Sequence, residues 1–303
     1  MKKSKMEILS AVVPPRSEYF GYTDMADELD CKRDSVTSGS IKTSRVVLDD
    51  LTAKKWGKPK GTYVTVETDV VNEDNKPDFD RLSKALSEAL GSVGSLEDCL
   101  VVGLGNPYLT ADALGTKVAK GLFVTRHLVQ RGSHKGGAHI LEHPTQGAGI
   151  GCLSVLCPSV LGITGIESAD VIKGTVDRIK PKSVLVVDSL ASASLSRIAC
   201  AFQANNAGIT PGSGIGNHRM TLSQETLGVP VCSIGVPLVV YATTILEEYA
   251  KSSKDTSEIA HMVVTPKDID LLVEDCAKII ATAINLAVHK NMTADDLRLV
   301  CGG

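Results

Sequence analysis

The 303-residue sequence contains few aromatic residues, which make up 4% of the chain and include a single tryptophan. Proteins that bind single-stranded nucleic acid use aromatic side chains to stack the bases, so this class of ligand is disfavoured. An excess of positive charge is also missing, because the formal net charge is −3. No basic field is therefore available to attract nucleic acid or an anionic membrane. We expect neither as a direct partner.

Long apolar runs are absent as well, and no uninterrupted stretch approaches the ~20 residues of a membrane-spanning helix. The lysines and the short apolar run at the N-terminus do not form a signal peptide, because Glu7 interrupts the run. The eight cysteines are scattered, mostly in apolar segments, which is typical of buried thiols in a reducing compartment. Cys152 and Cys157 have no second pair that would complete a zinc site. We expect a cytoplasmic protein.

Buried strands alternate with amphipathic helices along the sequence, which predicts an α/β fold with a mostly parallel sheet and helices on both faces. Residues 1–40 are polar and lack periodicity, which indicates an extended or loosely held leader in front of a single domain. Strands are expected at 61–71, 99–102, 181–188, 197–203 and 229–236, and a short strand or helical turn at 45–51. Helices are expected at 78–90, from 112 onward, and at 166–179, 238–250 and 267–286.

The most informative stretch is residues 99–115, in which an apolar strand ends in a glycine-rich loop. Gly103, Gly105 and Asn106 break the strand, and Asp112 follows just before a helical pattern begins. Ligands of open α/β sheets collect at the carboxyl ends of the strands, so Asp112 stands where a site would form. An isolated aspartate before an apolar run more often caps the helix, and this simpler interpretation stays open.

A second carboxylate, Asp188, ends the apolar strand at 181–188 in the same way. In a doubly wound sheet, the ends of two such strands can converge at one edge. Two carboxylates in a partly dry cleft cannot both ionise easily, so one keeps its proton. Such a pair can activate water and protonate a leaving amine. The alternative is that Asp112 caps a helix and that Asp188 is an ordinary loop residue.

Other motifs of this sequence are incomplete. The Gly-x-Gly turn at 103–105 lacks the third glycine of a dinucleotide site, and the loop at 212–216 lacks the Gly-Lys-Ser/Thr ending of a phosphate loop. His139 and His143 have the spacing of helical metal ligands, but they lie among glycines in a segment typical of a loop. No serine occupies a nucleophile elbow. We expect no metal ion and no other cofactor.

Several short blocks occur in a characteristic order. They are Gly-Leu-Gly-Asn at 103–106, Asp-Ala-Leu-Gly at 112–115, Val-Thr-Arg-His-Leu at 124–128, Gly-Ile-Thr-Gly-Ile-Glu-Ser-Ala-Asp at 162–170, Val-Asp-Ser-Leu-Ala at 187–191 and Gly-Ile-Thr-Pro-Gly-Ser-Gly-Ile-Gly-Asn at 208–217. In this order they resemble the germination protease family of spore-forming bacteria. The resemblance implies an atypical aspartic endopeptidase that degrades small acid-soluble spore proteins in the spore core. It also implies a homotetramer and a phosphorylase/hydrolase-like fold, as in hydrogenase maturation peptidases.

The resemblance assigns roles to individual residues. The two essential aspartates of the family match Asp112 and Asp188. Four further residues in or beside the matching blocks are candidates for lining the site, namely Asn106, His127, Glu167 and Ser213.

Members of the family are made as zymogens that lose a short leader. The matching stretch, Thr-Asp-Met-Ala-Asp-Glu at 23–28, puts the expected cut between Asp24 and Met25. Residues 1–24 would then be a removable propeptide, and residues 25–303 a single catalytic domain. The chain differs from the family after Asp188, where it reads Ser-Leu-Ala-Ser-Ala-Ser in place of an Ala-Ala-Arg run. This difference bears on substrate contacts more than on the class of reaction.

Three other interpretations remain open. Hydrogenase maturation endopeptidases share the Gly-x-Gly-Asn turn but bind nickel with two carboxylates and a histidine, which His127 or a loop histidine would have to supply here. Peptidyl-tRNA hydrolase shares Gly-Leu-Gly-Asn-Pro, although Leu128 stands here in place of its asparagine and the chain is acidic. A catalytically silent binding protein on the same fold is the third interpretation.

Overall fold

The computed structural model describes residues 33–68, 79–131, 149–192, 194–211, 220–249, 259 and 262–301. Its strands are β1 (Arg33–Ser38), β2 (Ile41–Leu48), β3 (Gly61–Glu67), β4 (Cys99–Gly103), β5 (Leu153–Leu156), β6 (Ser183–Ser192), β7 (Ala201–Asn205), β8 (Val231–Tyr241) and β9 (Val263–Val264). Its α-helices are α3 (Asp50–Trp56), α4 (Phe79–Val93), α5 (Leu114–Lys120), α6 (Arg126–Arg131), α7 (Leu161–Thr164), α8 (Ser168–Ile179), α9 (Gln224–Leu227), α10 (Ala242–Tyr249), α11 (Ile269–Val288) and α12 (Ala294–Cys301). Short 3-10 turns span Thr110–Asp112 and Leu195–Arg197.

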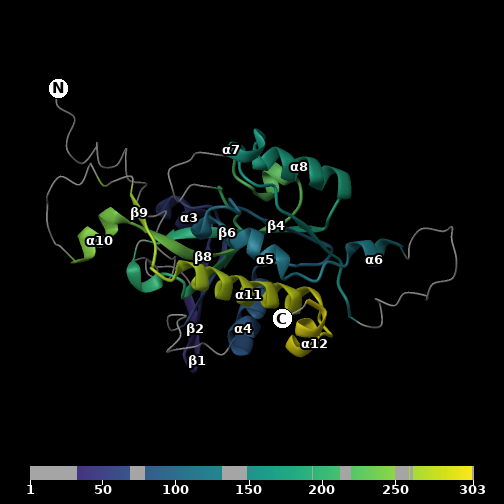
Figure 1. Ribbon diagram of the computed structural model, residues 1–303, viewed down its shortest axis with the longest axis horizontal. Helices are drawn as coiled ribbons and strands as arrows, with labels where there is room; N and C mark the ends of the chain where they lie inside the picture. Colours follow the sequence, from purple (N-terminus) through teal and green to yellow (C-terminus); the bar gives the residue numbers. More distant parts are fainter. Residues whose placement is uncertain are drawn as a thin grey trace.

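The strands form one nine-stranded mixed sheet in the order β1-β2-β3-β7-β8-β6-β4-β5, with β9 paired to β8 (Figure 1). The α/β class and the helices on both faces are therefore confirmed. Parallel pairing joins β5, β4, β6 and β8, which are the strands around the expected site. The rest of the sheet is antiparallel, so the sheet is mixed rather than mostly parallel. For β1 and β2 the reason is local, because the short turn at residues 39–40 can join only antiparallel neighbours.

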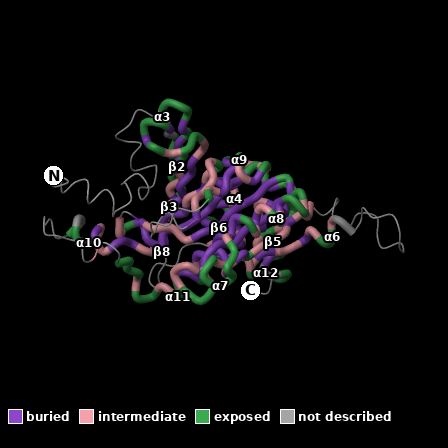
Figure 2. The backbone as a smooth tube through the Cα atoms, turned by 90° about the horizontal axis from the view of Figure 1, so that it is seen from above, coloured by how far each residue is buried: buried purple, intermediate pink, exposed green. Residues whose placement is uncertain are grey.

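The core lies on both faces of the central strands, whose successive side chains point to opposite sides. On one face, residues such as Val101 and Leu185 pack under α4, α5 and α11. On the other face, residues such as Val102 and Val186 pack under α8 and α9. Figure 1 shows α5 and α11 on one side of the sheet and α8 on the other, and Figure 2 shows the buried part of the chain concentrated in the central strands. No helix among the described residues is both long and apolar enough to cross a membrane.

Several expected elements differ from the structure; the strand expected at 197–203, for example, begins only at Ala201, after the 3-10 turn Leu195–Arg197. Residues 238–241 continue β8 rather than beginning a helix, because Leu238 and Val240 are buried in the core and Val240 pairs with β9. Helix α10 therefore starts at Ala242. Residues 33–38, expected to belong to a loosely held leader, form the edge strand β1, and residues 1–32 lie outside the described part of the chain.

The C-terminal end of α11 fastens two loops to the core through buried polar side chains. Asn285 Oδ1 accepts the Phe123 N–H at 2.9 Å, and Asn285 Nδ2 donates to the Gly121 carbonyl at 2.9 Å. His289 is fully buried, and its Nδ1 accepts the Gly151 N–H at 3.1 Å. Because Nδ1 is an acceptor, the proton of the neutral ring sits on Nε2, which lies 3.1 Å from the Phe123 carbonyl. Burial lowers the pKa of His289.

We expect this histidine to make the protein less stable in mild acid. A group whose pKa is lower in the folded than in the unfolded state stabilises the fold above its unfolded-state pKa, near 6.5 for histidine, and the contribution is lost as the pH falls through the folded-state pKa. Urea denaturation measured between about pH 4 and 8 checks this, because the free energy of unfolding of the His289→Gln variant should fall less steeply with acid. The same pH dependence in both proteins would contradict the assignment.

Candidate active site

Asp188 lies on β6 where the neighbouring strand β4 ends. The pairing between β4 and β6 stops at Gly103 and Val187, so Asp188 pairs on its other side only, with Gly235 of β8. The residue is 8% exposed, and its Oδ1 accepts the Ser189 N–H at 2.9 Å. A carboxylate is thus held nearly buried on β6 beside the end of β4, although β6 itself continues to Ser192 and does not end at Asp188 as the sequence predicted.

Asp112 closes the 3-10 turn Thr110–Asp112, which follows the loop after β4. Its Oδ2 accepts the backbone N–H of Asn106 at 2.7 Å. The helix that follows, α5, has Ala113 at its N-cap position and no side-chain cap hydrogen bond. The interpretation of Asp112 as a helix cap is therefore wrong. The Asp112 carboxylate lies instead against the loop at the end of β4.

Glycine makes this arrangement possible. Gly105 has a φ of +103°, and a Cβ atom at this position would lie 1.8 Å from the carbonyl oxygen of Asp112. A Cβ atom at Gly103 would similarly lie 2.2 Å from the carbonyl oxygen of Gly115 in α5. Only glycine allows backbone segments to approach this closely. The sequence Gly-Leu-Gly therefore lets the turn carrying Asp112 pack directly onto the end of β4.

Backbone contacts connect the two aspartates. The Leu104 N–H donates to the Val187 carbonyl at 2.9 Å, which places Gly105 and Asn106 beside the strand that carries Asp188. The Asp112 carboxylate in turn accepts the hydrogen bond from the Asn106 N–H. Residues of the turn Thr110–Asp112 and of β6 lie within 8 Å of each other between Cα atoms. The structure thus brings Asp112 and Asp188 to neighbouring positions at one edge of the sheet.

The other predicted residues are placed differently. Asn106 belongs to the loop beside Asp112, where its Oδ1 accepts the Tyr108 N–H at 2.9 Å and fixes the turn. Glu167 precedes α8 in the segment that follows β5, on the same edge of the sheet. Ser213, Asp24 and Met25 lie outside the described residues.

His127 is the one predicted site residue that the structure places away from the aspartates. It is exposed on α6, which begins next to Thr125, and the Thr125 N–H bonds the carbonyl of Leu153 at the start of β5. Its neighbour Arg126 pairs with Asp98, which precedes β4. Both contacts are at the amino ends of the strands. His127 therefore lies at the opposite edge of the sheet and does not line the site.

Three cysteines near the central strands, Cys99, Cys157 and Cys232, are poor candidates for a nucleophile. Burial raises the pKa of Cys99 to about 12 and that of Cys232 to about 11, and it also raises the pKa of Cys157 at the end of β5. These side chains stay as thiols at neutral pH, whereas nucleophilic cysteines have lowered pKa values. Within the described ranges, no group of three or more histidine, cysteine, aspartate or glutamate side chains could hold a metal ion.

The sequence reasoning missed a buried ion pair at the same edge of the sheet. Arg197, only 6% exposed, places its Nη1 3.0 Å from Oε1 of Glu67 at the end of β3. The sequence feature that could have indicated this pair is an arginine between the apolar residues Leu195 and Ile198, in a segment expected to start a strand. An arginine is rarely buried in such a segment unless it is paired.

Comparison with known proteins identifies the family to which the chain belongs. The sequence model of the germination protease family matches residues 22–251. The chain belongs to the germination protease family. The protein is 38% identical to the germination protease of Caldanaerobacter subterraneus subsp. tengcongensis, over 85% of this chain and 87% of that protein. It is 37% identical to that of Clostridium tetani, over 86% of this chain and 88% of that protein.

The similarity extends to bacilli. The germination protease of Bacillus licheniformis is 32% identical, over 93% of this chain and 90% of the relative. The prediction that the protein is a peptidase is therefore confirmed, and the match covers the 3-10 turn that carries Asp112 and the strand that carries Asp188.

Proposed function

We propose that this germination protease family member is an endopeptidase that begins the degradation of small acid-soluble spore proteins, using Asp112 and Asp188 as a catalytic pair. The observation that carries the proposal is the position of Asp112. The Asp112 carboxylate does not cap α5. It accepts a hydrogen bond from the Asn106 N–H in the loop after β4, next to β6, which carries Asp188. This arrangement would be unnecessary if the residue served only to start a helix.

The chemistry follows from placing two carboxylates near each other at a partly buried edge of the sheet. Repulsion between them favours a state with one proton on the pair. The ionised member can take a proton from a water molecule as this water attacks the peptide carbonyl, and the protonated member can donate its proton to the leaving amine. Because Asp188 is nearly buried, its interactions with the reacting groups are weakly screened.

The biological setting is part of the proposal. The substrates are small acid-soluble spore proteins, the compartment is the cytoplasm of the forespore and the spore core, and the active form is a homotetramer. Membership of the germination protease family supports this setting. We propose that no metal ion or other cofactor takes part.

Incubation of the purified protein with a small acid-soluble spore protein tests the proposal. We expect discrete internal cuts, with the product ends read by mass spectrometry and the same products in the presence of a chelator. An intact spore protein after prolonged incubation would overturn the assignment. Cleavage that stops on chelation and returns with nickel would favour the metal-dependent alternative.

We also propose that residues 1–24 are a propeptide that the enzyme removes from itself, which leaves residues 25–303 as the catalytic domain. N-terminal sequencing of the matured protein should therefore begin at Met25, and the Asp112→Asn variant should keep the full-length N-terminus. A different first residue would refute the cleavage site. Normal maturation of the variant would show that another protease does the processing.

A further inference from the structure

Strand β6 continues past the end of its neighbour β4 and leaves an edge open beside Asp188. The pairing of β6 with β4 stops at Val187 and Gly103, whereas β6 itself runs to Ser192. On its other side β6 stays paired with β8 over this length. The last part of β6 is therefore an edge strand on one side, although it lies in the middle of the sheet. We call residues 189–191 the open edge of β6.

The backbone groups of Ser189 and Ala191 point to this open side. Backbone N–H and C=O groups of a strand face its two neighbours alternately, residue by residue. The Val187 carbonyl accepts the Leu104 N–H at 2.9 Å on the side of β4, so the residues two and four positions further on face the same side. The pairing with β8 is irregular after Leu190, but the extra residue is on β8, so the alternation along β6 is unbroken.

Three of these backbone groups have no hydrogen-bond partner within the described part of the chain. They are the carbonyl of Ser189 and both the N–H and the carbonyl of Ala191. The Ser189 N–H is taken by Oδ1 of Asp188 at 2.9 Å. Residues 189–191 are all partly exposed. Because backbone polar groups require a partner, a row of free ones at an open edge is a template for an added strand.

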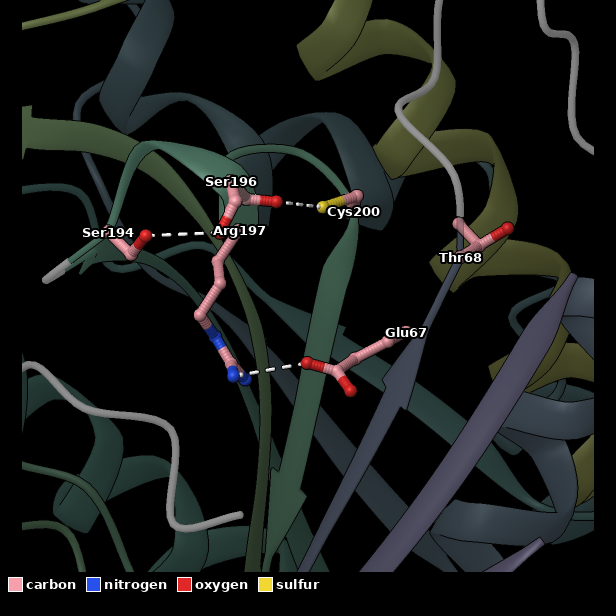
Figure 3. A pocket seen from close by; sticks show the side chains of 6 residues that line it. All are labelled: Glu67, Thr68, Ser194, Ser196, Arg197 and Cys200. Atoms are coloured by element: carbon pink, nitrogen blue, oxygen red, sulfur yellow. Dashed lines mark hydrogen bonds and ion pairs between the residues drawn. The ribbon is translucent and has the colours of Figure 1, made fainter. Parts of the chain in front are cut away.

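The segment that follows β6 turns away from the open edge. Figure 3 shows Arg197 beside Glu67 at the end of β3, and the distance from Nη1 to Oε1 is 3.0 Å. These two side chains line a polar pocket of about 390 Å³ together with Thr68, Ser194, Ser196 and Cys200. In the sheet order β3 lies on the β8 side of β6, opposite to β4. The chain therefore leaves β6 on the side away from its open edge.

The open edge begins at the candidate catalytic residues. Because Oδ1 of Asp188 accepts the Ser189 N–H, the carboxylate is turned to the open side. The loop after β4 makes its contact with β6 at Val187, and the Asp112 carboxylate is bonded to the same loop. A strand added along the open edge would lie about 4.8 Å from β6. One of its ends would therefore be next to both aspartates.

We propose that the open edge of β6 binds the substrate backbone as an added β-strand, which presents the peptide bond to Asp112 and Asp188. The proposal rests on the proposed function, because the occupant is the polypeptide to be cut. Strand addition is a common way to bind an extended peptide, and its affinity comes from main-chain hydrogen bonds. In either strand direction, the substrate N–H groups that bond β6 are two residues apart, because they alternate along the peptide.

N-methylation of the substrate tests this alternation on the unmodified protein. A peptide of residues 17–30 spans the expected cut between Asp24 and Met25. In a series of analogues, a methyl group replaces the backbone hydrogen of one residue at a time from 20 to 29, except at Met25. We expect kcat/KM to fall about tenfold at two positions that are two residues apart, and by less than about twofold at the residue between them. Equal rates, or losses without alternation, overturn the proposal.

Ala191→Pro removes the N–H from the protein side. Proline is tolerated in a strand where its missing N–H would face an open edge, so the pairing with β8 should be retained. We expect kcat/KM for the unmodified peptide to fall about tenfold, and an unchanged value would contradict the proposal. If this variant does not fold, as judged by circular dichroism, the N-methyl series decides alone.

Thr37→Pro is the matched control. Thr37 is exposed on β1, at the outer edge of the sheet and far from β6. Ser38 and Ile41 flank the two-residue turn and pair with each other, so the N–H of Thr37 faces away from β2. This variant should cleave the peptide at the full rate. An equal loss in both variants would mean that proline acts through the fold as a whole and would overturn the proposal.

Other occupants and other failures give different results. If the N-methyl series shows equal rates and Ala191→Pro lowers the mass of the assembly in sedimentation velocity, a second copy pairs with the edge and the proposal is overturned. Equal rates leave the endopeptidase assignment standing, whereas that assignment fails if the peptide and a spore protein both stay intact. Whenever the peptide is not cut, fluorescence anisotropy with the labelled series decides. Alternating losses of affinity of about tenfold support the open edge, and equal or absent binding overturns it.

Discussion

Replacing either Asp112 or Asp188 by asparagine should lower kcat/KM for spore-protein cleavage by about a thousandfold, the usual scale of a lost general acid or base. Asparagine cannot exchange the proton that the pair needs, but it has nearly the same shape. Its side-chain oxygen can still accept the N–H of Asn106 at position 112, or that of Ser189 at position 188. The fold should therefore be retained. Thermal denaturation of each variant would check this, and initial rates of cleavage would measure the loss of activity.

A matched control is available in the same chain. Asp177 is a carboxylate of α8 that pairs with Lys173 on the surface, close to where this helix ends. The Asp177→Asn variant should keep full activity, because exposed ion pairs of this kind contribute little. Full activity in either Asp112→Asn or Asp188→Asn would contradict the catalytic pair.

The second large effect is expected from Gly105→Ala. The new methyl group would lie 1.8 Å from the carbonyl oxygen of Asp112, at a φ of +103° that alanine rarely adopts. The loop would have to move, and Asp112 with it. We expect the free energy of unfolding to fall by about 3 kcal/mol, from overpacking and backbone strain together. Displacing a catalytic group by about 1 Å can cost a hundredfold in rate, and kcat should fall by about this factor.

Gly174→Ala is the corresponding control, because a Cβ atom at this position in α8 meets nothing within 4 Å. Alanine inside a helix is more stable than glycine by about 0.5–1 kcal/mol, so this variant should be slightly stabilised and fully active. If Gly105→Ala matched it in chemical denaturation and kinetics, the glycine turn would not be what positions Asp112.

The strands that carry the candidate site could be predicted from the sequence. Continuous apolar runs end at Gly103 and before Asp188, and such short runs are typical of strands that a parallel sheet buries on both faces. The glycine turn was equally informative, because its residue types allow a close backbone approach that the structure contains at Gly105. Local pattern therefore located Asp112 beyond the end of β4, but it ended the second strand too early, because β6 continues past Asp188 to Ser192.

What the sequence did not predict depends on contacts between distant segments. Leu238 to Tyr241 look helical in isolation, but burial in the core and pairing with β9 keep them in β8. His127 was placed near the aspartates because β5 is only four residues long and was not recognised. The contact between Thr125 and the start of β5 shows at which edge of the sheet α6 lies, so α6 cannot be placed when β5 is not recognised. Arg197 and Glu67 are far apart in the sequence, so their pairing follows from strand order alone.

The central claim is that Asp112 and Asp188 act as one catalytic unit, and a double-mutant comparison tests it most directly. Initial rates of spore-protein cleavage would be measured for Asp112→Asn, Asp188→Asn and the double variant under the same conditions. Residues that act together show strongly non-additive losses, so we predict that the double variant is no slower than the slower single variant. Losses that multiply, or a single variant with full activity, would contradict the claim.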